Sequence, residues 1–76
     1  MFDKLNVSER NRFIERLELW TIDSRHPMLN DHSLKGRLSG ARSFNVGGDL
    51  RAVYRLLNDG KLAVFDLIGT HSQLYG

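Results

Sequence analysis

The spacing of the apolar residues changes near residue 41, and this change constrains the fold more than any other feature of the sequence. In the first part of the chain, apolar side chains recur at the spacing of one helical face, at Phe13, Ile14, Leu17 and Trp20. Glu9 places an acidic side chain where a helix would begin, which suits the helix dipole. We therefore predict a helix over residues 9–22, with Ser8 as its N-cap.

Beyond residue 41, apolar and polar residues alternate with the period of β-strands. The predicted strands are residues 42–46, 50–57 and 61–68, and the hairpin turns between them are residues 47–49 and 58–60. Residues 23–40 are rich in turn-forming residues, so we expect an irregular segment with a helical turn near residues 31–35. The sequence predicts an α+β fold in a single domain, residues 1–76: an N-terminal helix packed on a three-stranded antiparallel β-meander.

The composition excludes several ways of stabilising so short a chain. A domain of 76 residues buries only about 60% of the surface that its unfolded chain exposes. The chain has no cysteine, which excludes disulfides and thiolate metal sites, and its three histidines need carboxylates to hold a metal. We therefore expect a partner chain, and neither a metal nor a cofactor. Without a membrane-spanning stretch or a signal-peptide segment, we also expect no membrane contact and a cytoplasmic location.

Positive charge is concentrated in the middle of the sequence. Residues 35–55 contain five basic residues against one acidic residue, a surplus of +4, although the whole chain carries only +2. The basic residues are Lys35, Arg37, Arg42, Arg51 and Arg55. Such a block favours a polyanion such as nucleic acid, although five basic residues can also lie scattered over a solvated surface.

Two of the predicted strands suggest where a nucleic acid would bind. Arg42 and Phe44 share one face of the first strand, and Arg51 and Arg55 share one face of the second. If these faces coincide, they form a concave basic surface with an aromatic residue on it. Guanidinium groups bind phosphate bidentately and an aromatic ring can stack on a base, so this surface would suit RNA.

Three residues are candidates for RNA cleavage, which needs a base, an acid and a cation beside the phosphorus. His71 follows an apolar strand and can project toward a ligand, or it can simply cap the sheet. His32 lies in a polar loop, where a solvent-facing histidine is the favoured interpretation. Asp49 is by default a turn-former, so a catalytic role for it needs support beyond the residues themselves. From the residues alone, the sequence indicates a small basic α+β domain suited to nucleic acid and nothing more specific.

Three segments resemble the RelE/StbE branch of the RelE/ParE superfamily of type II toxins, and its YafQ-like members in particular. They are HPMLNDHSLKG, RSFNVGGDLRAVYR and IGTHSQLY, and the stretch that holds them, residues 26–75, is two thirds of the chain. The Asp-His-x-Leu-x-Gly and Gly-Thr-His-x-x-Leu-aromatic patterns are fairly specific to this branch. The Gly-Asp-x-Arg-x-Val-Tyr pattern is shared more widely, including with ParE-like members that have another target.

The resemblance implies roles for residues at matching positions. His32 matches a loop histidine of the active site, Asp49 an acid implicated in proton transfer, and His71 a general acid or base. Arg51 matches an arginine that holds the scissile phosphate, and Tyr75 matches a terminal aromatic residue that stacks on or orients the substrate. The expected catalytic residues are thus His71, Asp49 and His32, with Arg51 and Tyr75 in substrate binding.

The sequence departs from the family pattern in three places. YafQ-like enzymes often have a histidine where this chain has Asn45, and an arginine where it has Leu67. The loss of that histidine and that arginine could slow the chemistry or shift phosphate binding onto Arg42 and Arg51. Family members also begin with a strand and a longer helical hairpin, so the usual first strand is expected to be missing here. That would expose a sheet edge, which a homodimer or a bound antitoxin could cover.

The resemblance therefore implies a toxin that cuts mRNA in the ribosomal A site without a metal. It also implies a cognate antitoxin as partner, with contact to operator DNA only through the antitoxin complex. Two alternatives remain open. The domain could be a catalytically weak binding protein that acts through its antitoxin, which Asn45 and Leu67 favour. It could also be a ParE-like gyrase inhibitor, against which the Gly-Thr-His pattern argues.

Overall fold

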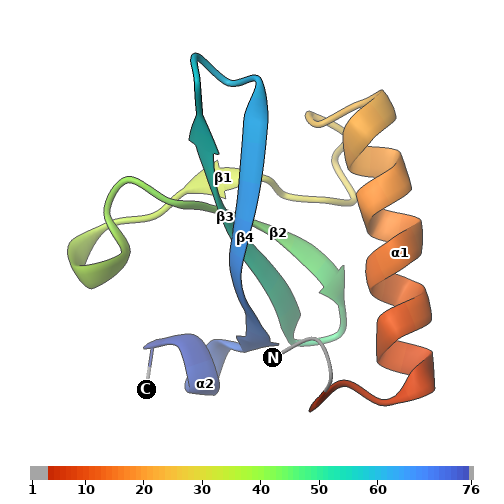
Figure 1. The fold of residues 1–76 in the computed structure, drawn as a ribbon. Helices are drawn as coiled ribbons and strands as arrows, with labels where there is room; N and C mark the ends of the chain where they lie inside the picture. The colour runs from red at the N-terminus through yellow and green to blue at the C-terminus, as the bar shows by residue number, and fades with distance from the viewer. Residues whose placement is uncertain (1–3, 76) are drawn as a thin grey trace.

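The computed structural model describes residues 4–75, except for the side chains of His71 and Tyr75. The chain forms helix α1, four strands and a short C-terminal helix α2 (Figure 1). Their bounds are α1 Val7–Ile22, β1 His32–Ser33, β2 Arg42–Gly47, β3 Leu50–Leu57, β4 Leu62–Thr70 and α2 His71–Tyr75, with a 3-10 turn, η2, at Gly36–Leu38. The strands form one antiparallel sheet in the order β1-β2-β3-β4.

The predicted α+β architecture is confirmed: an N-terminal helix packs on an antiparallel meander. Strand β3 has the bounds predicted for the second strand of the meander. Strand β4 ends two residues later than predicted. The structure adds β1, a two-residue strand in the segment where we expected a helical turn. It forms because His32 and Ser33 pair with Ser43 and Arg42 at the edge of the sheet. The helix α2 was not expected.

Helix α1 begins earlier than predicted, and Ser8 is not its N-cap. Asn6 caps the helix: its Oδ1 accepts a hydrogen bond of 2.8 Å from the Glu9 amide. Glu9 Oε1 accepts one of 3.0 Å from the Asn6 amide in return, which completes a capping box. The Asn-x-x-Glu spacing explains the choice, because only a residue three positions before Glu9 can make both bonds.

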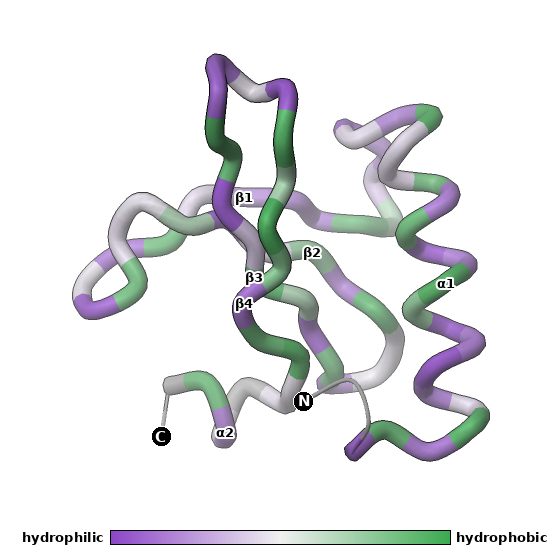
Figure 2. The backbone as a smooth tube through the Cα atoms, viewed as in Figure 1, coloured by the Kyte–Doolittle hydropathy of each residue, from purple (hydrophilic) through white to green (hydrophobic). Residues whose placement is uncertain are grey.

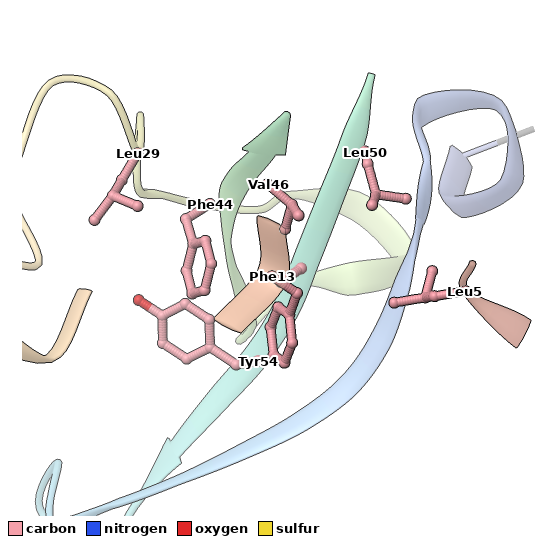
Figure 3. Packing of buried hydrophobic residues seen from close by; sticks show 8 residues of the cluster. Leu5, Phe13, Leu29, Phe44, Val46, Leu50 and Tyr54 are labelled. Carbon is pink, nitrogen blue, oxygen red and sulfur yellow. The ribbon is translucent and has the colours of Figure 1, made fainter. Parts of the chain in front are cut away.

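Helix α1 covers one face of the sheet through an aromatic core. Phe13 packs against Phe44 and Phe65, with ring centroids 6.5 Å and 5.7 Å apart, and Trp20 packs against Tyr54 at 5.1 Å. Figure 3 shows Phe13, Phe44 and Tyr54 within this cluster, and Figure 2 shows hydrophobic and hydrophilic residues interleaved along α1. In residues 4–75, no helix is long and apolar enough to cross a membrane.

A second, smaller core lies on the opposite face of the sheet. It consists of Leu34, Ala41, Val53 and Leu74, and Leu38 and Leu67 pack against it. The 3-10 turn η2 and the helix α2 thus cover part of the face that α1 leaves open. Leu67 is therefore part of an apolar contact in this protein.

The strand face with Arg42 and Phe44 does not coincide with the face that carries Arg51. In the β2–β3 pairing, Arg42 lies opposite Tyr54 and Asn45 lies opposite Arg51. Residues that face each other in antiparallel strands project to the same side of the sheet. Arg42 and Phe44 therefore lie on the α1 face, whereas Arg51 lies on the other. Phe44 is fully buried in the core and cannot stack on a base.

Candidate functional site

The sheet face opposite α1 brings together His32, Asn45 and Arg51. His32 lies opposite Ser43 on β2, and Asn45 is two residues further along the same strand, so both project to the same side. Arg51 lies opposite Asn45 on one neighbour strand and opposite Gly69 on the other. The three polar residues therefore form a row across β1, β2 and β3 that reaches the strand leading to His71.

Arg51 is held in this row by Asn45. Its Nη1 donates a hydrogen bond of 2.7 Å to Oδ1 of Asn45, and both residues are half-buried. Its Nε is buried and has no hydrogen-bond partner in the part of the chain that the structure describes. A guanidinium has five N–H donors, so Arg51 retains donors for an oxyanion while Asn45 fixes its position.

His32 has one ring nitrogen that is engaged and one that is available. Its Nδ1 lies 2.8 Å from the backbone oxygen of Asn30. Because a carbonyl oxygen can only accept, Nδ1 must carry the proton in this bond. The neutral ring then presents Nε2 as an acceptor, which is the state that a general base requires.

Asp49 and His71 meet at one end of the sheet. Leu50 lies opposite Thr70 in the last pair between β3 and β4. Asp49 directly precedes this pair in the exposed turn between β2 and β3, and His71 directly follows it as the first residue of α2. The backbone thus places both residues beside the pair that ends the ladder. The side chains of His71 and Tyr75, which we expected to act on RNA, lie outside the described residues.

A reciprocal pair of hydrogen bonds sets the start of α2. The Thr70 amide donates to Oε1 of Gln73 at 2.9 Å, and the Gln73 amide donates to Oγ1 of Thr70 at 3.2 Å. This is a capping box in which Thr70 is the cap, so His71 becomes the first helical residue. A Cβ on Gly69 would lie 2.9 Å from Oε1 of Gln73. The Gly-Thr-His pattern therefore has a local physical cause. Our sequence reasoning missed Gln73, although its Thr-x-x-Gln spacing is a recognisable signal.

Arg42, which we expected to bind phosphate, is not part of this site. It lies on the α1 face, where its Nε donates to Oδ1 of Asp31 at 2.7 Å. This hydrogen bond raises the pKa of Arg42. Arg55 forms an exposed ion pair with Asp66 at 2.7 Å. Among the described residues, no group of three or more histidine, cysteine, aspartate or glutamate side chains could hold a metal ion.

Comparisons with known proteins place this fold in a family. No protein-family model matches the sequence, and no curated protein is a significant match. A histidine-to-glutamine variant of YafQ from Escherichia coli is 30% identical with a TM-score of 0.65, and the alignment covers 87% of this chain and 73% of that chain. A copper-bound variant of a Helicobacter pylori toxin is 27% identical with a TM-score of 0.65, covering 96% and 78%. A chain of the E. coli DinJ–YafQ complex is 26% identical with a TM-score of 0.62, covering 97% and 79%.

The YafQ variant is 30% identical to this chain over most of both chains, which is enough to establish membership of the same family. The fold that matches is a helix packed on an antiparallel sheet, and in this protein that sheet carries His32, Asn45 and Arg51. This protein therefore belongs to the YafQ-like family of toxins.

Proposed function

We propose that this protein is the toxin of a type II toxin–antitoxin system and that it cleaves mRNA on the ribosome without a metal. Membership of the YafQ-like family supports the first part. The observation that carries the second part is the strand register. It aligns His32 and Arg51 on the face opposite α1 and brings Asp49 and His71 to the adjoining end of the sheet.

In the proposed reaction, the 2′-oxygen of a nucleotide attacks the neighbouring phosphorus and the bond to the 5′-oxygen breaks. The products are a 2′,3′-cyclic phosphate and a 5′-hydroxyl, so one proton leaves the attacking oxygen and one reaches the leaving oxygen. His71 and Asp49 would transfer these protons, with Nε2 of His32 as a further acceptor. Arg51 would hold the scissile phosphate through its remaining donors, and Tyr75 would stack on a base.

We further propose that a cognate antitoxin neutralises the protein and that contact with operator DNA occurs only through that complex. The support is the structural neighbour in the DinJ–YafQ complex. In the described sheet, β4 is an edge strand, so a strand of the antitoxin or of a second copy could pair with it. Action on ribosomes also implies a cytoplasmic location.

The proposal is tested by induced expression in a bacterial host, with growth and mRNA ends as readouts. We expect wild type to arrest growth and to produce new 5′ ends in ribosome-bound mRNA. His71→Ala and Asp49→Asn should each lower cleavage about a hundredfold at equal protein level, the size of a lost acid or base. Asp59→Asn is the matched control, because Asp59 is also an exposed residue of a hairpin turn, and it should cleave normally. If His71→Ala cleaves as fast as wild type, the assignment fails.

A second candidate function is a catalytically weak protein that acts through its antitoxin. The observation that favours it is the hydrogen bond between Asn45 and Arg51, because asparagine cannot transfer protons where family members often have histidine. Expression without growth arrest, together with stable antitoxin binding, would support this alternative. Growth arrest with intact mRNA and broken DNA would instead indicate a gyrase inhibitor.

A further inference from the structure

A pocket of about 700 Å³ opens on the sheet face that carries α1, on the other side from the candidate active site. Its wall comes from the end of α1, the segment between α1 and β1, and the strands β2 and β3. Figure 1 shows this segment running from the end of α1 to β1. Neither the proposed cleavage reaction nor the proposed antitoxin contact uses this pocket.

The only carboxylate in the pocket wall is already neutralised. The Asp31 side chain is 6% exposed, and its Oδ1 accepts a hydrogen bond of 2.7 Å from Nε of Arg42. Its Oδ2 accepts from the Tyr54 hydroxyl and, at 3.1 Å, from Nε1 of Trp20. Three donors occupy most of the roughly four lone-pair positions of this carboxylate, and the positive charge of Arg42 lies beside it, so Asp31 is a poor ligand for a cation. Its role is to hold Arg42 at the rim of the pocket.

Several other side chains of the wall can donate hydrogen bonds. The Arg42 side chain is 41% exposed; its Nε donates to Asp31 and its guanidinium also interacts with Tyr54, which leaves N–H donors at its terminal nitrogens. The guanidinium of Arg25 is exposed and makes no hydrogen bond within the described part of the chain. Nδ1 of His26 accepts from the Met28 amide at 3.1 Å, which puts the ring proton on Nε2. The amide of Asn30 also lines the wall.

The volume of the pocket and the apolar side chains in its wall indicate which class of ligand it can hold. The volume of about 700 Å³ lies within the range of small-molecule and cofactor sites. Leu56 is 45% exposed although it lies in the wall, and Trp20 and Tyr54 form the inner side. The wall contains two arginines, Arg25 and Arg42, and one carboxylate that is already paired, so it favours a ligand with an oxyanion group. A flat ring on the same ligand would cover the apolar surface at Leu56.

We propose that this pocket binds a phosphate-bearing ligand of mononucleotide size. The phosphate lies between Arg25 and Arg42 and accepts from the amide of Asn30. The ring lies against Leu56. The site is separate from Arg51 and the face that would hold the scissile mRNA, so it does not depend on the cleavage reaction.

The test is an NMR titration of the full chain, first with inorganic phosphate and then with adenosine monophosphate, at constant ionic strength. We expect saturable shifts of the Trp20 indole N–H and of the Arg25 and Asn30 amides. Adenosine monophosphate should bind more tightly than inorganic phosphate, because only the nucleotide has a ring. Equal affinities would overturn the ring contact. Shifts confined to the neighbourhood of Arg51, or the absence of saturable shifts, would overturn the site itself.

Three variants separate this site from general attraction to a basic protein. Arg25→Gln and Asn30→Asp should each weaken binding about fivefold, the effect expected of one partly exposed ionic contact. Asn30 has a positive φ of 45°, which aspartate also tolerates, so Asn30→Asp is expected to fold. Arg37→Gln is the matched control: Arg37 is an exposed arginine of η2 outside the pocket, and its loss should leave the affinity unchanged. Equal weakening in Arg37→Gln would overturn the proposal. Because binding alone is measured, a failure of the cleavage proposal would not affect this result.

Discussion

Nη1 of Arg51 donates a 2.7 Å hydrogen bond to Oδ1 of Asn45, its partner across β2 and β3. YafQ-like enzymes often have a histidine at the position of Asn45. A histidine side chain can gain and lose a proton, whereas the Asn45 side chain cannot and instead orients Arg51. We therefore propose that Arg51 is the fixed cation of the candidate site and that Asp49 and His71, at the adjoining end of the sheet, would transfer the protons.

If Asn45 acts only by orienting Arg51, replacing Asn45 should have no further effect on cleavage once Arg51 has been removed. We expect Asn45→Ala to lower mRNA cleavage about tenfold, because the guanidinium is no longer held in its productive orientation. Arg51→Ala should lower it further, and the double variant should be no slower than Arg51→Ala alone. Single-turnover cleavage of a model mRNA on ribosomes measures all three. Additive losses would show that Asn45 acts independently of Arg51.

Gln73 is expected to position His71 without contacting RNA. Gln73→Ala removes the side-chain acceptor of the Thr70 amide and leaves only the bond from the residue-73 amide to Oγ1 of Thr70. We expect cleavage to fall about tenfold while stability falls by about 1 kcal/mol or less. Gln73→Glu retains an acceptor for the Thr70 amide and should restore most of the activity. Ser72→Ala is the matched control within the same short helix, and it should behave as wild type. Failure of Gln73→Glu to restore cleavage would argue against a positioning role.

Gly69→Ala tests the same hydrogen bond between Thr70 and Gln73 without changing either of those residues. Its Cβ would lie 2.9 Å from Oε1 of Gln73, which must move and so release the Thr70 amide. We expect cleavage to fall as in Gln73→Ala, and the double variant Gly69→Ala with Gln73→Ala to be no worse than Gln73→Ala alone. Cleavage rates and thermal melting of the three proteins check this. A double variant much slower than either single one would mean that Gly69 serves another purpose.

Periodicity predicted the fold well because the buried face of each long element leaves a strong pattern. Helix α1 and strand β3 both contribute to one aromatic core, so their apolar residues recur at regular spacing. The two-residue strand β1 leaves no such pattern. It exists only because β2 offers a free edge to residues 32–33.

Strand register determines which candidate residues lie on the α1 face of the sheet and which lie on the opposite face, and local sequence does not specify that register. A register irregularity between Asn45 and Gly47 decides that Asn45, and not Val46, lies opposite Arg51. Arg42 consequently lies with Asp31 on the α1 face instead of joining Arg51. The roles of His32, Asp49, His71 and Arg51 were assigned through the family resemblance, and periodicity alone could not show that these residues lie near one another.

The start of α1 allows a direct test of which residue caps it. Asn6→Ala removes the acceptor for the Glu9 amide, and we expect a loss of about 1 kcal/mol in the free energy of unfolding. Ser8→Ala should change it by less than about 0.5 kcal/mol, because Ser8 is an exposed residue of the first turn. Urea denaturation of both variants gives the comparison. A larger effect from Ser8→Ala would restore Ser8 as the cap.

The Tyr54 hydroxyl links the core to Asp31, and its removal should destabilise the protein. Figure 3 shows the hydroxyl directed toward the end of the cluster at which Leu29 lies. It donates to Asp31 and accepts from Nε1 of Trp20 at 3.2 Å. We expect Tyr54→Phe to lower the free energy of unfolding by about 1–2 kcal/mol, the effect of a hydrogen bond to a charged group. Thr21→Val removes an exposed hydroxyl bond and should change stability far less in the same urea experiment.

The same hydroxyl predicts how stability depends on alkaline pH. Burial is the main cause that raises the pKa of Tyr54 above its ordinary value of 10.0, and the hydrogen bond to Asp31 raises it further. A raised pKa means that the folded protein holds this proton more tightly than the unfolded chain. The contribution is therefore complete below pH 10.0 and is lost as the pH rises through the folded-state pKa. Urea midpoints measured between neutral pH and pH 11 should fall most steeply above pH 10.0 in wild type. Tyr54→Phe should flatten that part of the curve, and an identical fall in Tyr54→Phe would assign the alkaline loss to other groups.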